Sequence, residues 1–476
     1  MLTKKTKIIC TMGPATDDDA VLKQLMKEGM DIARLNFSHG DHEEQLGRIN
    51  RIKKFREELD LPIAILLDTK GPEIRTGVLA GGEDVELEEG QKFTLTTREV
   101  EGTNEIVSVT YAELPEDVGV GNTILIDDGL MELRVDEIKD GTDVVCTVIN
   151  GGMLGSRKGI NVPNVKVNLP SITEKDKADI EFGLENGIDF IAASFIRNAD
   201  SVKEIKAIID AHGMDVGVIS KIENIEGVEN IDAIIDASDG VMIARGDLGV
   251  EIPAEEVPFL QKAIIKKCNN AFKPVVTATQ MLDSMIRNPR PTRAEVTDVA
   301  NAIYDGTDAI MLSGETAKGK HPVEAVRMMN QIAISTELHL DTKVNFRSVY
   351  VHRGISAAVA YAAVQTATNV NAKCILASSM SGFTARIVSK LKPDAQIIGL
   401  SPDPAVVRKM QLYWGVRPFL SHKADTTQEI LDEAADIVLN AGVADKDDVL
   451  VLTGGGVAER RGEGVTNMLK VIKIGE

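Results

Sequence analysis

The sequence predicts an α/β protein built from a (β/α)8 TIM barrel, an inserted antiparallel β domain and a C-terminal open-sheet α/β domain. Three observations predict this fold class. Eight short apolar runs alternate with amphipathic stretches, which is the pattern of strand and helix units in a parallel sheet. One interval between runs is several times longer than the others, and further strand and helix patterns follow the eighth run. The 476 residues also suit about three domains at roughly 150 residues each.

The eight apolar runs are spaced like repeated strand and helix units. Six of the seven steps from the start of one run to the start of the next measure 24 to 35 residues, which fits a strand, a loop and a helix. Eight such strands close a barrel. We therefore expect the barrel to comprise residues 1–69 and 170–340. The runs are Lys7–Gly13, Asp31–Phe37, Ala64–Thr69, Asp189–Phe195, Val216–Glu223, Gly240–Leu248, Pro274–Gln280 and Ala309–Thr316.

The long interval after the third run predicts an inserted domain at residues 70–169. Polar and apolar residues alternate there in short runs that are punctuated by Gly, Asn and Asp, which is typical of a small antiparallel β domain. The segment contains 9 basic and 19 acidic residues, so it carries half of the net charge of −20. Residues 341–476 contain helix and strand patterns in turn, and this predicts an open-sheet α/β domain.

Charge and composition exclude several classes of protein. A net charge of −20 argues against a general binder of nucleic acid or anionic membranes, because both need an outward basic field. No apolar run approaches the roughly 18 residues of a membrane span, and the start has no apolar stretch typical of a signal peptide. The four cysteines form no C-x-x-C pair, so we expect them to be reduced and mostly buried. These features predict a cytoplasmic protein.

Polar residues gather where the predicted strands end. In a barrel of this type the loops at the C-terminal ends of the strands converge and carry the functional groups. We therefore take these positions as the candidate site. The residues at the strand ends are Arg34, Asn36, Ser38, Asp68, Thr69, Lys221, Glu223, Gly246, Asp247, Thr279 and Ser313.

Glu223 and Asp247 suggest a divalent metal site. They lie one strand and helix step apart, so we expect them to face each other on neighbouring strands. Two carboxylates in this arrangement suit Mg²⁺, which fills its remaining positions with water and substrate oxygens. Alternatively, they are buried acids that bond to Arg245 or Lys221, and base rates for a single pair favour this interpretation.

Lys221 and a second group of oxygen atoms extend the candidate site. Lys221 lies two residues before Glu223, and the two-residue period of a strand points both side chains the same way. A lysine beside a metal suits an anion whose charge must be neutralised during transfer, although a lone lysine at a strand end is ordinarily solvated. The second group carries one formal charge and fits a monovalent cation, or it consists of turn formers and helix caps. It comprises Asn36, Ser38, Asp68 and Thr69.

Two other patterns carry little weight. Residues Gly314–His321 nearly match the phosphate loop G-x-x-x-x-G-K-[ST], but His321 replaces the metal-binding hydroxyl and Glu315 would repel phosphate. His39 and His42 are close in sequence but have no third ligand nearby. We therefore expect neither a nucleotide loop nor a histidine metal site.

Five longer motifs together closely resemble the pyruvate kinase family. The resemblance is collinear from Lys7 to the C-terminus, and several of the motifs are long and specific. They are Arg34–Gly40, Leu67–Thr76, Ile219–Asn224, Ala244–Val250 and Asn288–Glu295.

The resemblance implies transfer of the phosphoryl group of phosphoenolpyruvate to ADP, giving pyruvate and ATP in the last step of glycolysis. Two cations are implied as cofactors. The ligands of Mg²⁺ (or Mn²⁺) would be Glu223 and Asp247. The ligands of K⁺ would be Asn36, Ser38, Asp68 and Thr69.

The resemblance also implies roles for the other candidates. Arg34 would contact the substrate phosphate, and Lys221 would stabilise the migrating phosphoryl group. The backbone of Gly246 and Asp247 and the Thr279 hydroxyl would meet the substrate carboxylate. Thr279 and Ser313 are the candidates for a proton relay to the enolate. The nucleotide would be bound by Arg75, Lys158 and Asn36.

Positioning and charge neutralisation are the main tasks in phosphoryl transfer, and the inserted domain would serve this reaction as a lid. A lid excludes water that could otherwise take the phosphoryl group. Lys158 would move with this lid and reach the nucleotide phosphates on closure.

The C-terminal domain resembles the regulatory domain of the family, where a phosphorylated effector binds. A segment that follows a strand and opens a helix offers hydroxyl and backbone N–H groups to phosphate, and a Gly-rich loop could add positive charge. Alternatively, the two are a helix cap and a solvated loop. The residues are Ser379, Ser381, Gly382, Thr384, Arg460 and Arg461. The resemblance also implies a homotetramer.

Two other functions compete with this interpretation. A C–C lyase on the phosphoenolpyruvate type of barrel also uses a Glu and an Asp for Mg²⁺, but it leaves the insertion, the second oxygen group and Arg75 unexplained. A catalytically silent scaffold or RNA-associated protein is disfavoured because Lys221, Glu223 and Asp247 are intact and the chain is acidic. Pyruvate formation that depends on ADP, followed with lactate dehydrogenase, decides among them.

The first testable prediction concerns Glu73. Family members with Glu at this position resemble the K⁺-dependent type, whereas those with Lys supply the positive charge internally. The Glu73→Lys variant should therefore need less K⁺ for full activity than the parent protein. The measurement is the rate of pyruvate formation as a function of K⁺ concentration, and an unchanged requirement would count against the charge argument.

Overall fold

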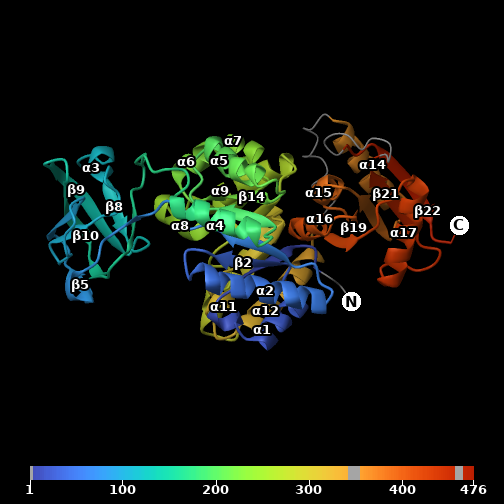
Figure 1. The fold of residues 1–476 in the computed structure, drawn as a ribbon, viewed down its shortest axis with the longest axis horizontal. Helices are drawn as coiled ribbons and strands as arrows, with labels where there is room; N and C mark the ends of the chain where they lie inside the picture. The colour runs from blue at the N-terminus through green and yellow to red at the C-terminus, as the bar shows by residue number, and fades with distance from the viewer. Residues whose placement is uncertain (1–3, 341–353, 456–464, 476) are drawn as a thin grey trace.

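The computed structural model describes residues 4–340, 354–455 and 465–475. It has three parts that follow one another along the longest axis of the molecule (Figure 1). A closed eight-stranded barrel lies in the centre, a β-rich insert lies on one side, and a C-terminal α/β part lies on the other. Within these residues, no helix is long and apolar enough to cross a membrane. All four cysteines are free and buried, as predicted.

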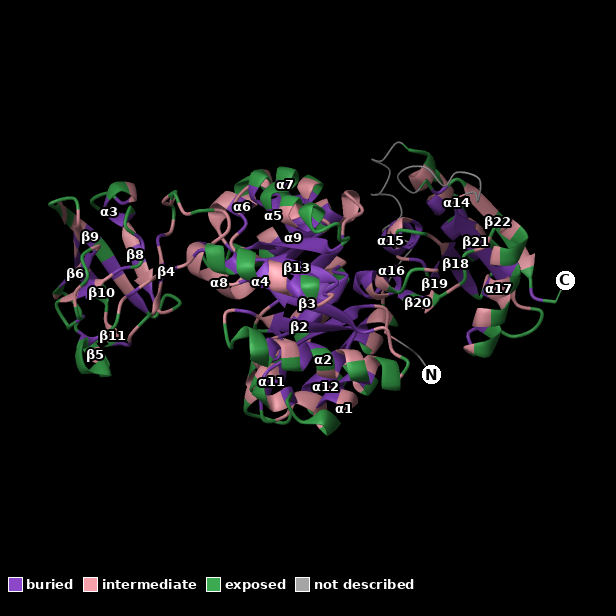
Figure 2. Ribbon diagram, viewed as in Figure 1, coloured by how far each residue is buried: buried purple, intermediate pink, exposed green. Residues whose placement is uncertain are grey.

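The predicted (β/α)8 barrel is confirmed, because eight parallel strands close on themselves. Their side chains are almost wholly buried, and Figure 2 shows the strands as a purple core beneath a ring of helices. In order of hydrogen bonding the strands are β1 (Lys7–Thr11), β17 (Ala309–Leu312), β16 (Val275–Ala278), β15 (Gly240–Ala244), β14 (Gly217–Ile222), β13 (Phe190–Ala193), β3 (Ala64–Asp68) and β2 (Ile32–Asn36).

Helices cover the outside of the barrel, and several begin at side chains that cap their free N–H groups. Thr173 forms a capping box with Asp176, and Thr292 forms one with Glu295. The main helices are α1 (Asp19–Glu28), α2 (His42–Glu58), α4 (Glu174–Glu185), α5 (Ala199–Ala211), α7 (Ile231–Ala237), α9 (Val257–Asn270), α10 (Arg293–Asp305) and α12 (Pro322–Glu337). Shorter helices are α6 (Ile225–Glu229), α8 (Arg245–Glu251) and α11 (Gly314–Ala317).

The barrel strands are shorter than the apolar runs from which they were predicted. The run Gly240–Leu248 forms a strand only to Ala244, after which the chain enters α8. The run Ala309–Thr316 likewise ends its strand at Leu312 and enters α11. Apolar residues continue past these strand ends because the short helices are also packed against the barrel, so hydrophobicity alone does not mark the boundary.

The insert, elements β4 to β12, lies between β3 and α4. It contains a seven-stranded sheet with the order β4-β12-β8-β9-β10-β6-β7 and a two-stranded sheet β11-β5. Its pairs are antiparallel as predicted, except that β6 and β7 pair in parallel. The strands are β4 (Ile74–Arg75), β5 (Val85–Leu87), β6 (Lys92–Thr96), β7 (Ile106–Ser108), β8 (Thr123–Ile126), β9 (Met131–Lys139), β10 (Asp143–Asn150), β11 (Gly152–Leu154) and β12 (Gly159–Asn161). The helix α3 (Leu114–Asp117) precedes β8.

The C-terminal part is an open five-stranded sheet with helices. Four strands are parallel and the last, β22, is antiparallel to β21. In sheet order the strands are β20 (Val416–Leu420), β19 (Gln396–Ser401), β18 (Cys374–Ser378), β21 (Val449–Gly454) and β22 (Met468–Lys473). The helices are α14 (Ile355–Asn369), α15 (Phe383–Lys390), α16 (Pro404–Lys409) and α17 (Thr427–Asn440).

The C-terminal part closes the barrel at the end opposite the site. The apolar residues inside the barrel form one continuous cluster with those of the C-terminal sheet and helices. Charged groups also cross this interface. Asp308, which is fully buried just before β17, pairs with Lys390 and with Lys392 at 3.3 Å. The Lys392 ammonium also lies 4.4 Å from the centre of the Trp414 ring.

The largely buried side chain of Lys392, which is 11% exposed, leads to a prediction on how stability depends on pH. Burial lowers the pKa of Lys392 from 10.5 to about 8, against the opposing attraction of Asp308. Below pH 8 the lysine is charged in both the folded and the unfolded protein. The free energy of unfolding is then lowered by the full cost of burying the charge. Between pH 8 and 10.5 the folded protein releases this proton first, so the stability of the parent protein should rise relative to that of Lys392→Met.

The measurement is the difference in unfolding temperature between the parent protein and Lys392→Met from pH 7 to pH 10. The matched control is Lys203→Met, which removes an exposed lysine of α5. The difference should grow in favour of the parent protein above pH 8 for Lys392→Met only. Parallel curves for Lys392→Met would contradict the prediction.

Candidate active site

A row of alternating charges lies at the C-terminal ends of β2, β3 and β14. Arg34 Nε donates to Asp68 Oδ2 at 2.7 Å, and Lys221 Nζ donates to Asp68 Oδ1 at 3.1 Å. Lys221 Nζ also lies 2.9 Å from Glu223 Oε1. All four side chains are buried. Lys221 and Glu223 point the same way, as the period of the strand predicts.

Each charge in this row depends on its neighbours. Burial alone would raise the pKa of Asp68, but Arg34 and Lys221 hold it below its ordinary value. Burial would lower the pKa of Lys221, but Asp68 and Glu223 raise it instead. Both groups are therefore charged at neutral pH. Removing one member would leave a buried, unpaired charge, which is strongly destabilising.

The two predicted metal ligands follow the neighbouring strands β14 and β15, as expected, but neither lies within its strand. Glu223 directly follows β14, whereas Asp247 lies in the first turn of α8, where the chain has already left β15. Glu223 is paired with Lys221, but Arg245 is paired with Asp298 rather than Asp247. The alternative interpretation, in which the acids are buried and bonded to Arg245 or Lys221, therefore applies only to Glu223.

The donor set at Glu223 and Asp247 fits Mg²⁺. Burial raises the pKa of Glu223, and repulsion from Asp247 adds to the rise, so an added cation would relieve the excess negative charge. In the parts of the chain that the structure describes, no group of three or more His, Cys, Asp or Glu side chains is placed to hold a metal. A pair of carboxylates is what Mg²⁺ uses when substrate oxygens and water complete its shell.

The strand register brings two members of the second oxygen group, Asn36 and Asp68, side by side. Asn36 pairs with Asp68 across β2 and β3, and Ser38 and Thr69 follow directly. Asn36 Oδ1 accepts a hydrogen bond from the Ser38 backbone N–H at 3.0 Å, so the predicted role as a turn former also holds for Asn36. Arg34 and Lys221 already compensate the charge of Asp68. This arrangement suits a weakly held monovalent cation.

Thr279 and Gly246 bond directly to each other. The Gly246 backbone N–H donates to Thr279 Oγ1 at 2.7 Å, and Thr279 Oγ1 donates to the Ala278 carbonyl at 2.6 Å. Thr279 has a φ of 69°, a left-handed backbone that costs energy for a β-branched residue. This strained turn directs the hydroxyl towards the start of α8.

Ser313 follows β17 and is held by Glu315. The buried Glu315 carboxylate accepts the Ser313 backbone N–H at 2.8 Å and the Leu282 backbone N–H at 3.0 Å. It therefore connects the loops after β17 and β16, which carry Ser313 and Thr279. The phosphate-loop match at Gly314–His321 is explained by this structural role, because Gly314–Ala317 forms the short helix α11.

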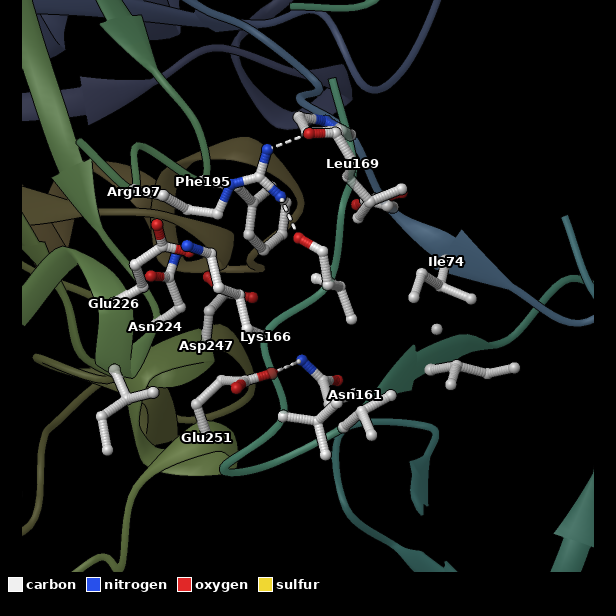
Figure 3. A pocket seen from close by; sticks show the side chains of 18 of the residues that line it. Ile74, Asn161, Lys166, Leu169, Phe195, Arg197, Asn224, Glu226, Asp247 and Glu251 are labelled. Atoms are coloured by element: carbon white, nitrogen blue, oxygen red, sulfur yellow. Dashed lines mark hydrogen bonds between the residues drawn. The ribbon is translucent and has the colours of Figure 1, made fainter. Parts of the chain in front are cut away.

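A pocket of about 710 Å³ lies between the insert and the barrel. Arg75 and Lys158 line it from the insert and Asp247 lines it from the barrel, whereas Arg34 and Lys221 are not among its lining residues. Arg75 Nε donates to Glu73 at 2.6 Å, and Lys158 Nζ lies 2.8 Å from Asp127. Figure 3 shows Asp247, Glu251 and Arg197 around this pocket.

Comparisons with known proteins agree with this geometry. Residues 3–326 match the family model "Pyruvate kinase, barrel domain", and residues 357–472 match "Pyruvate kinase, alpha/beta domain". A pyruvate kinase of Geobacillus stearothermophilus is 52% identical over all of this chain and 81% of its own length. A pyruvate kinase of Staphylococcus aureus is 48% identical over 99% of this chain and 81% of its own. The chain belongs to the pyruvate kinase family.

A solved structure supports the same assignment. A pyruvate kinase from Cryptosporidium parvum superimposes with a TM-score of 0.94 at 41% identity, covering 99% of this chain and 96% of the other. The function is that of a pyruvate kinase, a phosphotransferase that moves the phosphoryl group of phosphoenolpyruvate to ADP. The lyase and scaffold hypotheses are therefore set aside.

Three of the candidate effector residues, Ser379, Ser381 and Gly382, lie between β18 and α15, and Thr384 lies in the first turn of α15, so this segment follows a strand and opens a helix as predicted. Ser379 and Ser381 are accessible, and Gly382 has the left-handed φ of 78° that starts the helix. Thr384 is buried and its hydroxyl lies 2.8 Å from that of Thr466. Arg460 and Arg461 lie outside the described residues.

One segment of the candidate site, the turn Ser194–Arg197 after β13, was not predicted from the sequence. Ser194 Oγ accepts a hydrogen bond from Lys221 Nζ at 2.7 Å, and the Phe195 backbone N–H donates to Glu223 Oε2 at 2.6 Å. The run Asp189–Phe195 was predicted as a strand, and the rule that strand ends carry function would have indicated Ser194. No sequence signal marks the Phe195 backbone contact.

Proposed function

We propose that the row Arg34, Asp68, Lys221 and Glu223 is where this pyruvate kinase receives the phosphoryl group of phosphoenolpyruvate. Phosphoryl transfer leaves little covalent work to the protein, so positioning and charge neutralisation are the main tasks. The single observation that carries the proposal is that two buried cations are held rigidly by one buried carboxylate, Asp68. A preorganised charge of this kind needs no rearrangement when the phosphoryl group moves.

Arg34 and Lys221 contact the phosphate group of the substrate from two sides. Arg34 binds the phosphate of the substrate, and Lys221 faces the phosphoryl group as negative charge spreads over its oxygens. Each keeps hydrogen bonds to Asp68, which limits the freedom of both side chains before substrate arrives. Because both side chains are already ordered, less entropy is lost in reaching the transition state.

Two metal ions add positive charge to the site. Glu223 and Asp247 hold Mg²⁺ (or Mn²⁺), and the second oxygen group holds K⁺. When bound, these ions neutralise the charge of the phosphoryl and nucleotide oxygens. The support is the pair of carboxylates at the barrel mouth and the compensated charge of Asp68. The K⁺ ligands are Asn36, Ser38, Asp68 and Thr69.

The insert acts as a lid that delivers the nucleotide. Arg75 and Lys158 bind ADP, and Asn36 contributes from the barrel side. Both insert cations line the pocket while paired with Glu73 and Asp127, so the nucleotide phosphates replace carboxylate partners that are already near. Closure of the lid excludes water and protects the phosphoryl group from hydrolysis.

Protonation of the enolate occurs on the side of Thr279 and Ser313. The Gly246 N–H and the Thr279 hydroxyl bond to each other and turn to the substrate carboxylate when it binds. Glu315 fixes the loops that carry Thr279 and Ser313. The two hydroxyls therefore keep the same position relative to each other. A relay through these hydroxyls gives the methylene carbon its proton.

We also propose a homotetramer in the cytoplasm, in line with a glycolytic enzyme. Two exposed aromatic side chains, Phe259 of α9 and Tyr304 of α10, support an interface between copies, because such groups are enriched at protein contacts. A phosphorylated effector binds at Ser379, Ser381, Gly382 and Thr384 with Arg460 and Arg461. A panel of sugar phosphates and nucleotides in the activity assay identifies it.

The proposal predicts the behaviour of Lys221→Met. This variant keeps a side chain of similar length but loses the charge that faces the phosphoryl group. The kcat for pyruvate formation should fall by at least about a hundredfold, the loss typical for one preorganised charge. Mn²⁺ binding, followed by electron paramagnetic resonance, should persist, because Glu223 and Asp247 remain and the bound cation compensates the charge of Glu223 that Lys221 had paired.

Lys221→Arg is the comparison that retains the charge, and it should keep more activity than Lys221→Met. Circular dichroism and the unfolding temperature check that each variant is folded. Near-normal turnover by a folded Lys221→Met protein would refute the assigned role.

A further inference from the structure

The turn Ser194–Arg197 contacts both the charged row and the two connections between the insert and the barrel. The segment leaves β13 and leads into α5. Phe195 has a φ of 54°, a left-handed conformation that a bulky residue rarely adopts. Strain of this kind persists only where the surroundings determine it. The contacts of the turn on its two sides identify those surroundings.

On its inner side the turn holds the charged row. The Ser194 hydroxyl accepts a hydrogen bond from Lys221 Nζ at 2.7 Å and donates to the Thr69 carbonyl at 2.7 Å. The Phe195 N–H donates to Glu223 at 2.6 Å. Lys221 and Glu223 therefore depend on this turn for their positions.

On its outer side the turn holds the return connection, residues 162–173 between β12 and α4. The guanidinium of Arg197 donates to the carbonyls of Val167 at 3.3 Å, of Pro170 at 3.2 Å and of Leu169. Figure 3 shows Arg197 pointing at this connection from the barrel side. Glu226 of α6 attracts the charge of Arg197, while the hydrogen bonds of the guanidinium go to the carbonyls of the connection.

The outgoing connection, residues 69–73, packs on the same turn. Gly71 has a φ of 74°, and a Cβ at this position would lie 2.8 Å from Ser194 Cβ and 2.8 Å from the Phe195 ring. Only glycine allows so close an approach. The Ser194 backbone N–H also donates to Thr69 Oγ1 at 3.1 Å. Both covalent connections of the insert therefore meet one four-residue turn.

We propose that Arg197 is a positioning residue which, through the turn Ser194–Arg197, sets where the insert sits relative to Lys221 and Glu223. The inference rests on the proposed role of the insert as a lid. Arg75 and Lys158 move with the insert, and a misplacement of about 1 Å can cost roughly a hundredfold in rate. A loosened return connection should therefore weaken the use of ADP more than the binding of phosphoenolpyruvate, which depends on the barrel.

The test uses the distance between the insert and the barrel, measured without substrate or metal. Spin labels are placed at Val120→Cys in the insert and Met214→Cys in the barrel, which are 71% and 40% exposed. The four native cysteines are buried and react slowly. Double electron–electron resonance then gives the distance distribution, with labelled protein diluted by unlabelled protein so that distances between copies do not contribute.

Arg197→Ala should broaden or shift this distribution and raise the KM for ADP roughly tenfold, with less than about a twofold change in the KM for phosphoenolpyruvate. Arg197→Lys, which keeps a donor but loses the planar fork, should lie between Arg197→Ala and the parent protein. The matched control is Arg56→Ala, which removes an arginine that donates to the Ile63 carbonyl before β3. It should leave the distance distribution unchanged.

An unchanged distance distribution in a folded Arg197→Ala protein would overturn the proposal. Equal changes in both KM values, with a lowered unfolding temperature, would also overturn it, because they indicate a merely structural residue. Failure of the nucleotide assignment would appear differently. In that case Arg75→Ala and Lys158→Ala would keep a normal KM for ADP, while the distance change in Arg197→Ala would still be observed.

Discussion

The Asp68 carboxylate is the group on which the rest of the site depends. It is buried at the end of β3 and binds Arg34 with one oxygen and Lys221 with the other. Without it, two largely buried cationic side chains would lie close together, at a cost of several kcal/mol. With it, both cations stay charged and fixed, as the proposed role in handling an anionic phosphoryl group requires.

The register of the barrel strands sets the position of the Asp68 carboxylate. The insert and the turn after β13 are arranged around it. Asp68 aligns with Asn36 of β2 and with Ala192 of β13, so residues distant in sequence meet at one mouth. The turn after β13 then connects the charged row to both ends of the insert. The acidic net charge of −20 extends into the pocket between the insert and the barrel, which is lined by more acidic than basic side chains. Capture of anions is therefore local and does not depend on long-range attraction.

The barrel and the gathering of charged side chains at its strand ends could be predicted because both follow from simple periods, whereas the roles of the individual residues came from the family resemblance. Strand and helix spacing indicated the eight strands, and the two-residue period placed Lys221 and Glu223 on one side. The position of Asp247 on α8, the left-handed backbone of Thr279 and the Phe195 contact with Glu223 were not predicted. These features depend on tertiary contacts that set the direction of the chain after a strand ends. No local sequence pattern predicts such contacts. The charge-bearing residues were predictable, whereas the backbone that aims them was not.

The most direct test of this account is a double-mutant cycle on kcat with Asp68→Asn, Lys221→Met and the double variant. If Asp68 acts mainly by holding Lys221, the two effects are strongly coupled. The account predicts that Asp68→Asn slows the Lys221→Met protein much less than it slows the parent protein, with a remaining loss because Arg34 and K⁺ also depend on Asp68. Losses that multiply, so that the double variant is slower by the product of the two single effects, would show independent action and contradict the account.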